Sequence, residues 1–89
     1  MHIVLDIVYG NGEVHSFSFA VEDDEGLIQM AQHYAGPKDN WTLFFRGRPI
    51  GPYFVRNFQY HRDWTVYDSR QYRLELKFNN DVPMDIENP

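Results

Sequence analysis

Three stretches of the chain alternate apolar and polar residues with a period of two, which is typical of β-strands that bury one face. They cover residues 2–9, 13–21 and 72–78. The first two stretches flank Gly10-Asn11-Gly12, and an Asn-Gly pair accepts the positive φ angles that a tight reversal requires. We therefore predict a β-hairpin at the start of the chain and a further strand near its end.

A helical pattern follows the hairpin. Four apolar residues recur with the spacing of one helix face, namely Leu27, Met30, Ala31 and Tyr34. The acidic run Glu22–Glu25 precedes them, and acidic side chains suit a helix N-terminus because the free N–H groups there attract negative charge. Gly36 and Pro37 end the pattern, since glycine favours a C-terminal cap and proline does not continue a helix. The pattern predicts one amphipathic helix of about three turns.

The rest of the chain gives weaker patterns. Residues 41–45 are mostly apolar and predict another strand, which Gly47 closes. The pattern over residues 51–71 is irregular and rich in Tyr, Phe and Arg. Residues 79–89 lack periodicity and are expected to be a flexible acidic tail. The predicted domain therefore covers residues 1–78.

One hairpin followed by a helix and further strands predicts an α+β roll in which the helix packs on one face of the sheet. The chain has 89 residues, of which 43% are hydrophobic, so it is long enough for one domain with one modest core. No apolar run approaches the ~20 residues that span a bilayer, and the N-terminal pattern does not resemble a signal peptide. We expect a cytoplasmic (cytosolic) or nuclear protein that does not enter a membrane.

The net charge of −5 is unevenly distributed along the chain. Residues 1–45 hold seven acids and one base, whereas residues 46–77 hold seven bases and three acids. A nucleic-acid-binding domain is usually basic overall, so the total argues mildly against that role. The basic half still matters for recognition, because electrostatic fields act locally.

No residues stand out as a catalytic or metal centre. The four histidines lack the local spacing of metal ligands, and the chain contains no cysteine. No Ser or Thr has the context of an activated nucleophile, and no phosphate-binding loop is present. We therefore expect neither an enzyme nor a protein that holds a metal or a cofactor.

Several strings, taken in order, resemble ubiquitin and its ubiquitin-like relatives over residues 1–78. The strings are Pro37-Lys38-Asp39, Leu43–Ile50, Asp63–Val66 and Tyr72–Leu76. The resemblance implies a β-grasp fold, which is a mixed sheet with central, parallel first and last strands and one main helix across one face. The chain departs from the family in having extra residues between Ile50 and Asp63, so we expect an enlarged loop there. The side chains expected to face the helix or lie on it are Ile3, Leu5, Phe17, Ile28, Leu43, Leu74 and Leu76.

The resemblance also bears on conjugation. Conjugated members of the family end in Gly-Gly shortly after the last strand, whereas Asn79-Asn80-Asp81 occupies that region here and no two glycines are adjacent in the chain. The sheet-face patch of the family falls on Phe44, Arg73 and Glu75, and two of these three positions are charged here. We expect a non-conjugated protein-interaction module, an adaptor or scaffold, with a diverged partner.

The candidate binding site lies on the face of the sheet that alternation turns away from the helix. Because the resemblance makes the first, last and third strands neighbours, their outward side chains share one surface. An apolar centre ringed by bases has the composition of a binding hot spot and favours a protein partner with an acidic surface. The expected site residues are Val4 and Phe44 at the centre, with Arg46, Arg48, Arg73 and Lys77 around them. The alternative is that Phe44 is a single exposed apolar residue, which is common.

A second functional interpretation rests on residues 53–73, which interleave aromatic residues with arginines. Rings that stack on bases and arginines that contact phosphates produce this pattern in RNA-binding domains. The competing explanation, which we favour, is that the aromatic residues fill the core, since a domain of this size needs large side chains to bury. An RNA-binding ubiquitin-like domain is therefore the alternative function.

Overall fold

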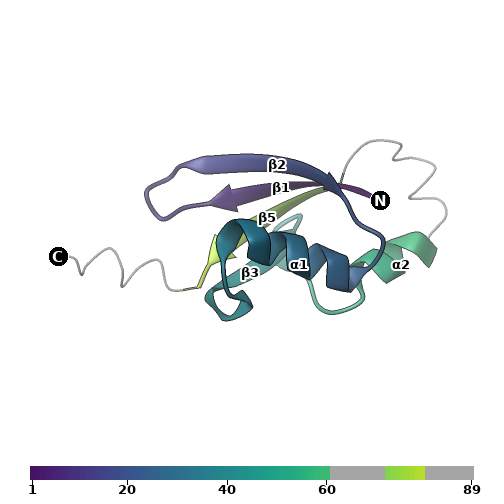
Figure 1. Ribbon diagram of the computed structural model, residues 1–89. Coiled ribbons are helices and arrows are strands. Elements are labelled where there is room, and N and C mark those ends of the chain that lie inside the picture. Colours follow the sequence, from purple (N-terminus) through teal and green to yellow (C-terminus); the bar gives the residue numbers. More distant parts are fainter. Residues whose placement is uncertain (61–71, 80–89) are drawn as a thin grey trace.

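The computed structural model describes residues 1–60 and 72–79, which form a five-stranded mixed sheet with one long helix across one face (Figure 1). The strands are β1 (His2–Val8), β2 (Val14–Ala20), β3 (Trp41–Phe45), β4 (Arg48–Pro49) and β5 (Tyr72–Phe78). The helices are α1 (Asp24–Ala35), the 3₁₀ helix η1 (Lys38–Asn40) and α2 (Phe54–Tyr60). The predicted α+β class, with a mixed sheet and one main helix, is confirmed. The predicted Asp63–Val66 element and the acidic tail beyond Asn79 lie outside the described residues.

The first and last strands meet at the centre of the sheet. The strand order is β2-β1-β5-β3-β4. Strands β1 and β5 run parallel, whereas the other neighbouring pairs are antiparallel. Leu5 pairs with Phe17 of β2 on one side and with Leu74 of β5 on the other. The central, parallel pairing of the first and last strands is therefore present.

The β1–β2 hairpin turns at the predicted Gly-Asn-Gly segment. The N–H of Tyr9 donates to the carbonyl of Glu13 at 2.9 Å, and the N–H of Glu13 donates to the Asn11 side chain at 2.9 Å. Gly12 has a φ of 94°, a value that residues with a Cβ rarely adopt. The turn thus fixes the register of the pair, and with it the face on which each side chain lies.

Helix α1 begins and ends where the sequence pattern indicates. The Asp23 carboxylate accepts a hydrogen bond from the N–H of Gly26 at 2.8 Å, which caps the N-terminus, and two further acids lie in the first turn. At the other end Gly36 has a φ of 87° and donates its N–H to the carbonyl of Gln32 at 2.8 Å. Local sequence therefore determines both ends of this helix.

The core lies between α1 and the face of the sheet that it covers. The predicted core residues that are buried there are Ile3, Leu5, Leu43, Leu74 and Leu76. Phe17 and Ile28, also predicted, are half-buried against this cluster. Phe17 stacks on Tyr34 of α1 with ring centroids 3.9 Å apart, so that the β2 edge of the sheet is packed on the helix through aromatic rings.

Helix α2 is not predicted by the sequence pattern, which is irregular over residues 51–71. In the structure Phe54, Val55 and Phe58 of this helix enter the core. Its first turn is stabilised from a distance, because the N–H of Val55 donates to the Asp24 carboxylate at 2.7 Å. The expectation of irregular structure is therefore wrong for α2.

Strand β4 is also absent from the sequence prediction. Arg46 and Gly47 form a two-residue turn with φ angles of 54° and 81°, after which Arg48 pairs with Phe45. Positive φ at both central residues is the requirement of a type I′ turn. The turn returns the chain antiparallel along β3 and creates an additional short edge strand.

Leu43 lies in the core with 4% of its surface exposed. Truncation to alanine removes buried methyl groups and leaves a cavity, so we expect Leu43→Ala to lower the free energy of unfolding by about 2–5 kcal/mol. Urea denaturation followed by circular dichroism measures this loss. Val14→Ala is the control, because Val14 is 52% exposed, and we expect a change of less than about 0.5 kcal/mol there. Equal losses for the two variants would contradict the assignment of Leu43 to the core.

Candidate functional site

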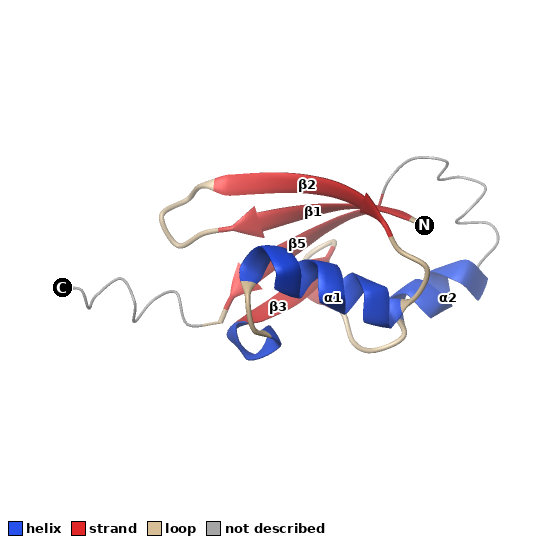
Figure 2. Cartoon of the chain, in the orientation of Figure 1, coloured by secondary structure: helices blue, strands red, loops and turns tan. Residues whose placement is uncertain are grey.

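The face of the sheet opposite α1, called the outer face, is the surface on which the predicted site falls (Figure 2). Asp6 of β1 pairs with Ser16 of β2 and with Glu75 of β5. Glu75 pairs in turn with Phe44 of β3. Paired residues share one side of a sheet. The outer face therefore carries the even-numbered residues of β1, β2 and β3 and the odd-numbered residues of β5.

A buried carboxylate lies at the centre of the outer face. Asp6 is 8% exposed, and its Oδ1 accepts a hydrogen bond from the Ser16 hydroxyl at 2.6 Å. Nη1 of Arg73 donates to both carboxylate oxygens of Asp6, at 2.6 and 2.7 Å. Burying an unpaired carboxylate is costly. The two partners together therefore explain how this strand position accommodates a charge.

The same contact orients Arg73. Its side chain is 62% exposed, yet Nη1 is held against Asp6. A guanidinium has five N–H donors, and those on Nε and Nη2 form no hydrogen bond to another described residue. Arg73 therefore presents a pre-oriented set of donors, which suits recognition of a carboxylate.

Phe44 is half-buried rather than freely exposed. Nζ of Lys77 lies 5.1 Å from the centroid of its ring, within the range of a cation–π contact. The same Nζ lies 3.8 Å from Oε1 of Glu75. The structure thus brings the expected aromatic residue and a basic neighbour together, with the cation over the ring.

Val4 and Arg48 do not occupy the positions expected of them. Val4 points to the outer face, but only 6% of its surface is exposed, so it provides no open apolar centre. Arg48 pairs with Phe45 and therefore lies on the α1 side of the sheet, away from Phe44. Simple alternation along the chain fails for Arg48 because the intervening turn reverses the strand.

Arg46 lies in this turn, with its guanidinium carbon 5.0 Å from the centroid of the Phe45 ring. Together with Asp6, Arg73 and Glu75 it lines an open hollow of about 440 Å³. Two arginines and two acidic residues therefore line the same hollow, beside Phe45 and Tyr72. Within the described part of the chain Arg46 forms no ion pair, so it is a cation of this surface whose charge is not neutralised by a described neighbour.

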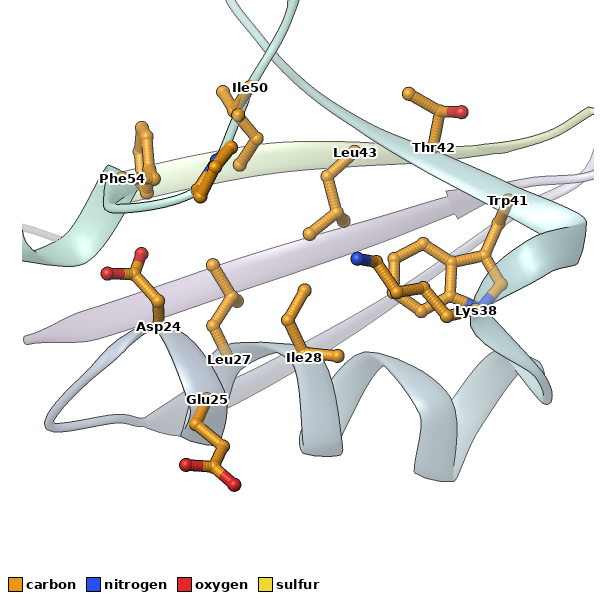
Figure 3. Close-up of a pocket in the computed structure, with 12 residues that line it drawn as sticks. Asp24, Glu25, Leu27, Ile28, Lys38, Trp41, Thr42, Leu43, Ile50 and Phe54 are labelled. Atoms are coloured by element: carbon orange, nitrogen blue, oxygen red, sulfur yellow. The ribbon is translucent and has the colours of Figure 1, made fainter.

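A second hollow, which sequence reasoning missed, lies between α1 and β3 (Figure 3). Its volume is about 340 Å³, and Leu27, Ile28 and Leu43 contribute to an apolar middle. Asp24 and Lys38 lie at its opposite ends, as Figure 3 shows. The Asp24 carboxylate is already engaged, since it accepts an N–H from α2. No sequence signal identifies this hollow, because its residues come from elements that local patterns do not bring together.

The aromatic and basic segment proposed for RNA binding is described in part. Phe54, Phe58 and Tyr72 are buried in the core. Tyr53, in contrast, is 56% exposed, with the guanidinium carbon of Arg56 5.0 Å from its ring centroid. Burial of three of these rings supports the core-packing interpretation for the residues concerned.

Within residues 1–60 and 72–79 no group of three or more His, Asp or Glu side chains is arranged to hold a metal ion. In the same residues no helix is both long enough and apolar enough to cross a bilayer. Comparison with known proteins gave no assignment, since no family model and no curated protein matches the chain. The functional argument therefore rests on the geometry of the outer face.

We expect the loss of one partner of the Asp6–Arg73 contact to destabilise the fold more than the loss of both partners. Removal of the guanidinium leaves a buried carboxylate with Ser16 as its described partner, so we expect Arg73→Met to lower the free energy of unfolding by about 1–3 kcal/mol. The double variant Asp6→Leu, Arg73→Met removes both charges and is expected to regain most of this loss. Urea unfolding of Arg73→Met, of Asp6→Leu and of the double variant measures both effects. Simple additivity of the two single losses would rule out a direct coupling.

Proposed function

We propose that this chain is a ubiquitin-like β-grasp domain that works as a non-conjugated protein-interaction module, an adaptor or scaffold, through its outer face. The observation that carries the proposal is the strand order β2-β1-β5-β3-β4 with a parallel central pair and α1 across one face (Figure 1). This arrangement agrees with the order of elements that the resemblance to ubiquitin implies. Among the described elements no helix covers the outer face (Figure 2).

Arg73 is the first recognition residue of the proposed site. Ordering a long side chain on binding costs conformational entropy, and the hydrogen bonds from Nη1 of Arg73 to Asp6 already restrict this side chain in the free protein. The donors on Nε and Nη2 match the planar, bidentate geometry of a carboxylate. A partner that offers Asp or Glu at this point gains a charge-assisted contact without ordering the arginine.

Phe44 is the aromatic member of the same surface. Its ring lies under Nζ of Lys77, and Glu75 pairs with it across the β3–β5 register. A lysine side chain has a flexible stem and a strongly hydrated head, so an apolar group of a partner is able to displace it from the ring. Burying the ring under such a group contributes the apolar part of the binding energy.

The charges of the outer face favour an acidic partner group near the turn. Arg73 and Lys77 are each close to a carboxylate of the same face. Arg46 has no such described neighbour, and it lines the hollow that Arg73 also lines. A carboxylate placed in this hollow therefore meets two arginines, one from the β3–β4 turn and one from β5.

The proposal predicts a specific pattern of binding losses. We expect Phe44→Ala and Arg46→Glu each to reduce partner capture from cell lysate by about tenfold, equivalent to about 1.4 kcal/mol. Arg48→Glu is the matched control, because it makes the same change of charge two residues away but on the α1 side of the sheet. The melting temperatures of all three variants are expected to stay close to that of the parent protein. Capture that is equal for all three variants places the partner surface elsewhere.

RNA binding is tested with a further variant, Arg56→Glu. Contacts to phosphate weaken steeply with salt concentration, so titration with RNA oligomers at rising salt identifies them. Steeply salt-dependent RNA binding that is lost in Arg56→Glu, which removes the cation over the exposed Tyr53 ring, would favour the alternative function. The protein-interaction proposal expects no such binding.

We also predict that the protein forms no thioester with ubiquitin-activating enzymes and ATP. The position after β5 is Asn79, whose N–H donates to the carbonyl of Asn40 at 2.8 Å and whose Oδ1 accepts from the Thr42 hydroxyl at 2.7 Å. These contacts hold the chain against β3 and η1 where conjugated relatives have a glycine-ended extension. Non-reducing electrophoresis after incubation, with ubiquitin as the positive control, is the measurement. A thiol-sensitive adduct would contradict the non-conjugated assignment.

A further inference from the structure

Strand β2 forms one edge of the sheet (Figure 2). Its only described pairing is with β1. The other long side of the strand therefore presents its backbone groups with no described strand beside it. An edge of this kind is a ready template for another strand.

The hydrogen bonds at the two ends of the hairpin show which residues of β2 direct their backbone N–H and C=O groups away from β1. Met1 and Val21 exchange two backbone hydrogen bonds, of 2.9 and 3.1 Å, and the N–H of Tyr9 donates to the carbonyl of Glu13. In an antiparallel ladder such pairs recur at every second residue, so the odd-numbered residues of β2 face β1. The outward backbone groups consequently belong to Val14, Ser16, Ser18 and Ala20.

Features that protect edge strands are missing from β2. Natural edges are blocked by proline, by lysine or other charges, by bulges or by very short length. Strand β2 has seven residues, VHSFSFA, without proline, lysine, arginine or acid. Its register with β1 is continuous over all seven residues, so no bulge interrupts it. The four outward residues are all exposed and have small side chains.

We propose that β2 pairs with β2 of a second copy of this chain, antiparallel and around a two-fold axis at Phe17. In this register Ser16 pairs with Ser18 of the second copy, and Val14 pairs with Ala20. All four outward residues then exchange backbone hydrogen bonds, because donors and acceptors alternate with the same spacing on both strands. The contact is isologous, so it closes at a dimer.

The side chains of β2 fit this occupant. On the α1 side Phe17 lies opposite its own copy and His15 lies opposite Phe19, which gives aromatic cross-strand pairs. Phe17 and Phe19 are half-buried in the single chain, so pairing covers apolar area that is still exposed. Strand β2 contains no Asp, Glu, Lys or Arg, so the two copies of the strand bring no like charges of these side chains together.

The test is sedimentation equilibrium of the full chain over about three decades of concentration. We expect the mass to rise from the monomer value of 10.6 kDa to twice that value and no further. Added salt is expected to strengthen association, because each copy carries a net charge of −5 that screening reduces. Ser18→Lys and Val14→Lys are each expected to raise the dissociation constant at least about tenfold. Gln32→Lys on the exposed surface of α1 is the control with the same change of charge.

Amide hydrogen exchange gives an independent measurement at the residues concerned. Protection at Ser16 and Ser18 is expected to grow with protein concentration, whereas protection at Phe17, whose N–H faces β1, is expected to stay constant. A chain that is monomeric throughout, a mass beyond the dimer, or lysine variants that associate like the parent would each overturn the proposal. Phe44→Ala is expected to leave the dimer intact, so failure of the outer-face proposal is distinguishable from failure of this one.

Discussion

The parallel pairing of β1 with β5 is the contact on which the rest of the structure depends. Leu5 of β1 and Leu74 of β5 are fully buried on the α1 side of this pair. On the outer side the same pair positions Asp6 next to Arg73, which closes the central charge contact. Parallel strands need a long crossover, and here β2, α1 and β3 are among the elements that lie between them in sequence. The core and the candidate site are therefore two sides of one long-range pairing.

Local sequence determines most of the secondary structure, and long-range contacts determine what it misses. Period-two alternation predicts β1, β2 and β5, and the acidic run Glu22–Glu25 and Gly36 predict the two ends of α1. Helix α2 escapes prediction because it is seven residues long and has no acid in its first turn. The carboxylate that accepts a hydrogen bond from the first turn of α2 belongs to Asp24. Because Asp24 lies 31 residues from Val55 in sequence, no local pattern predicts this contact.

The sequence predicts on which face of the sheet most of the candidate site residues lie, but it does not predict how exposed they are. Alternation correctly turns Val4 and Phe44 to the outer face. It gives no information on burial, so it does not show that Val4 is covered or that Lys77 lies over the Phe44 ring. The partner of Asp6 is 67 residues away in sequence, which hides the central contact from any local pattern. Arg48 is misplaced for a geometric reason, since two turn residues with positive φ reverse the chain and change the face.

The buried carboxylate limits how the outer face is able to recognise a partner. If Arg73 swung away toward a partner, Asp6 would keep only the Ser16 hydroxyl as a described donor, which is costly for a group that is 8% exposed. In the proposed site Arg73 is therefore expected to contact a partner from the position that it already holds. Adaptable contacts have to come from Arg46 and Lys77, which no buried partner restrains among the described residues. The proposed pairing at the β2 edge uses backbone groups instead, so changes at Phe44, Arg46 and Lys77, which lie outside β2, are expected to alter partner choice without altering self-association.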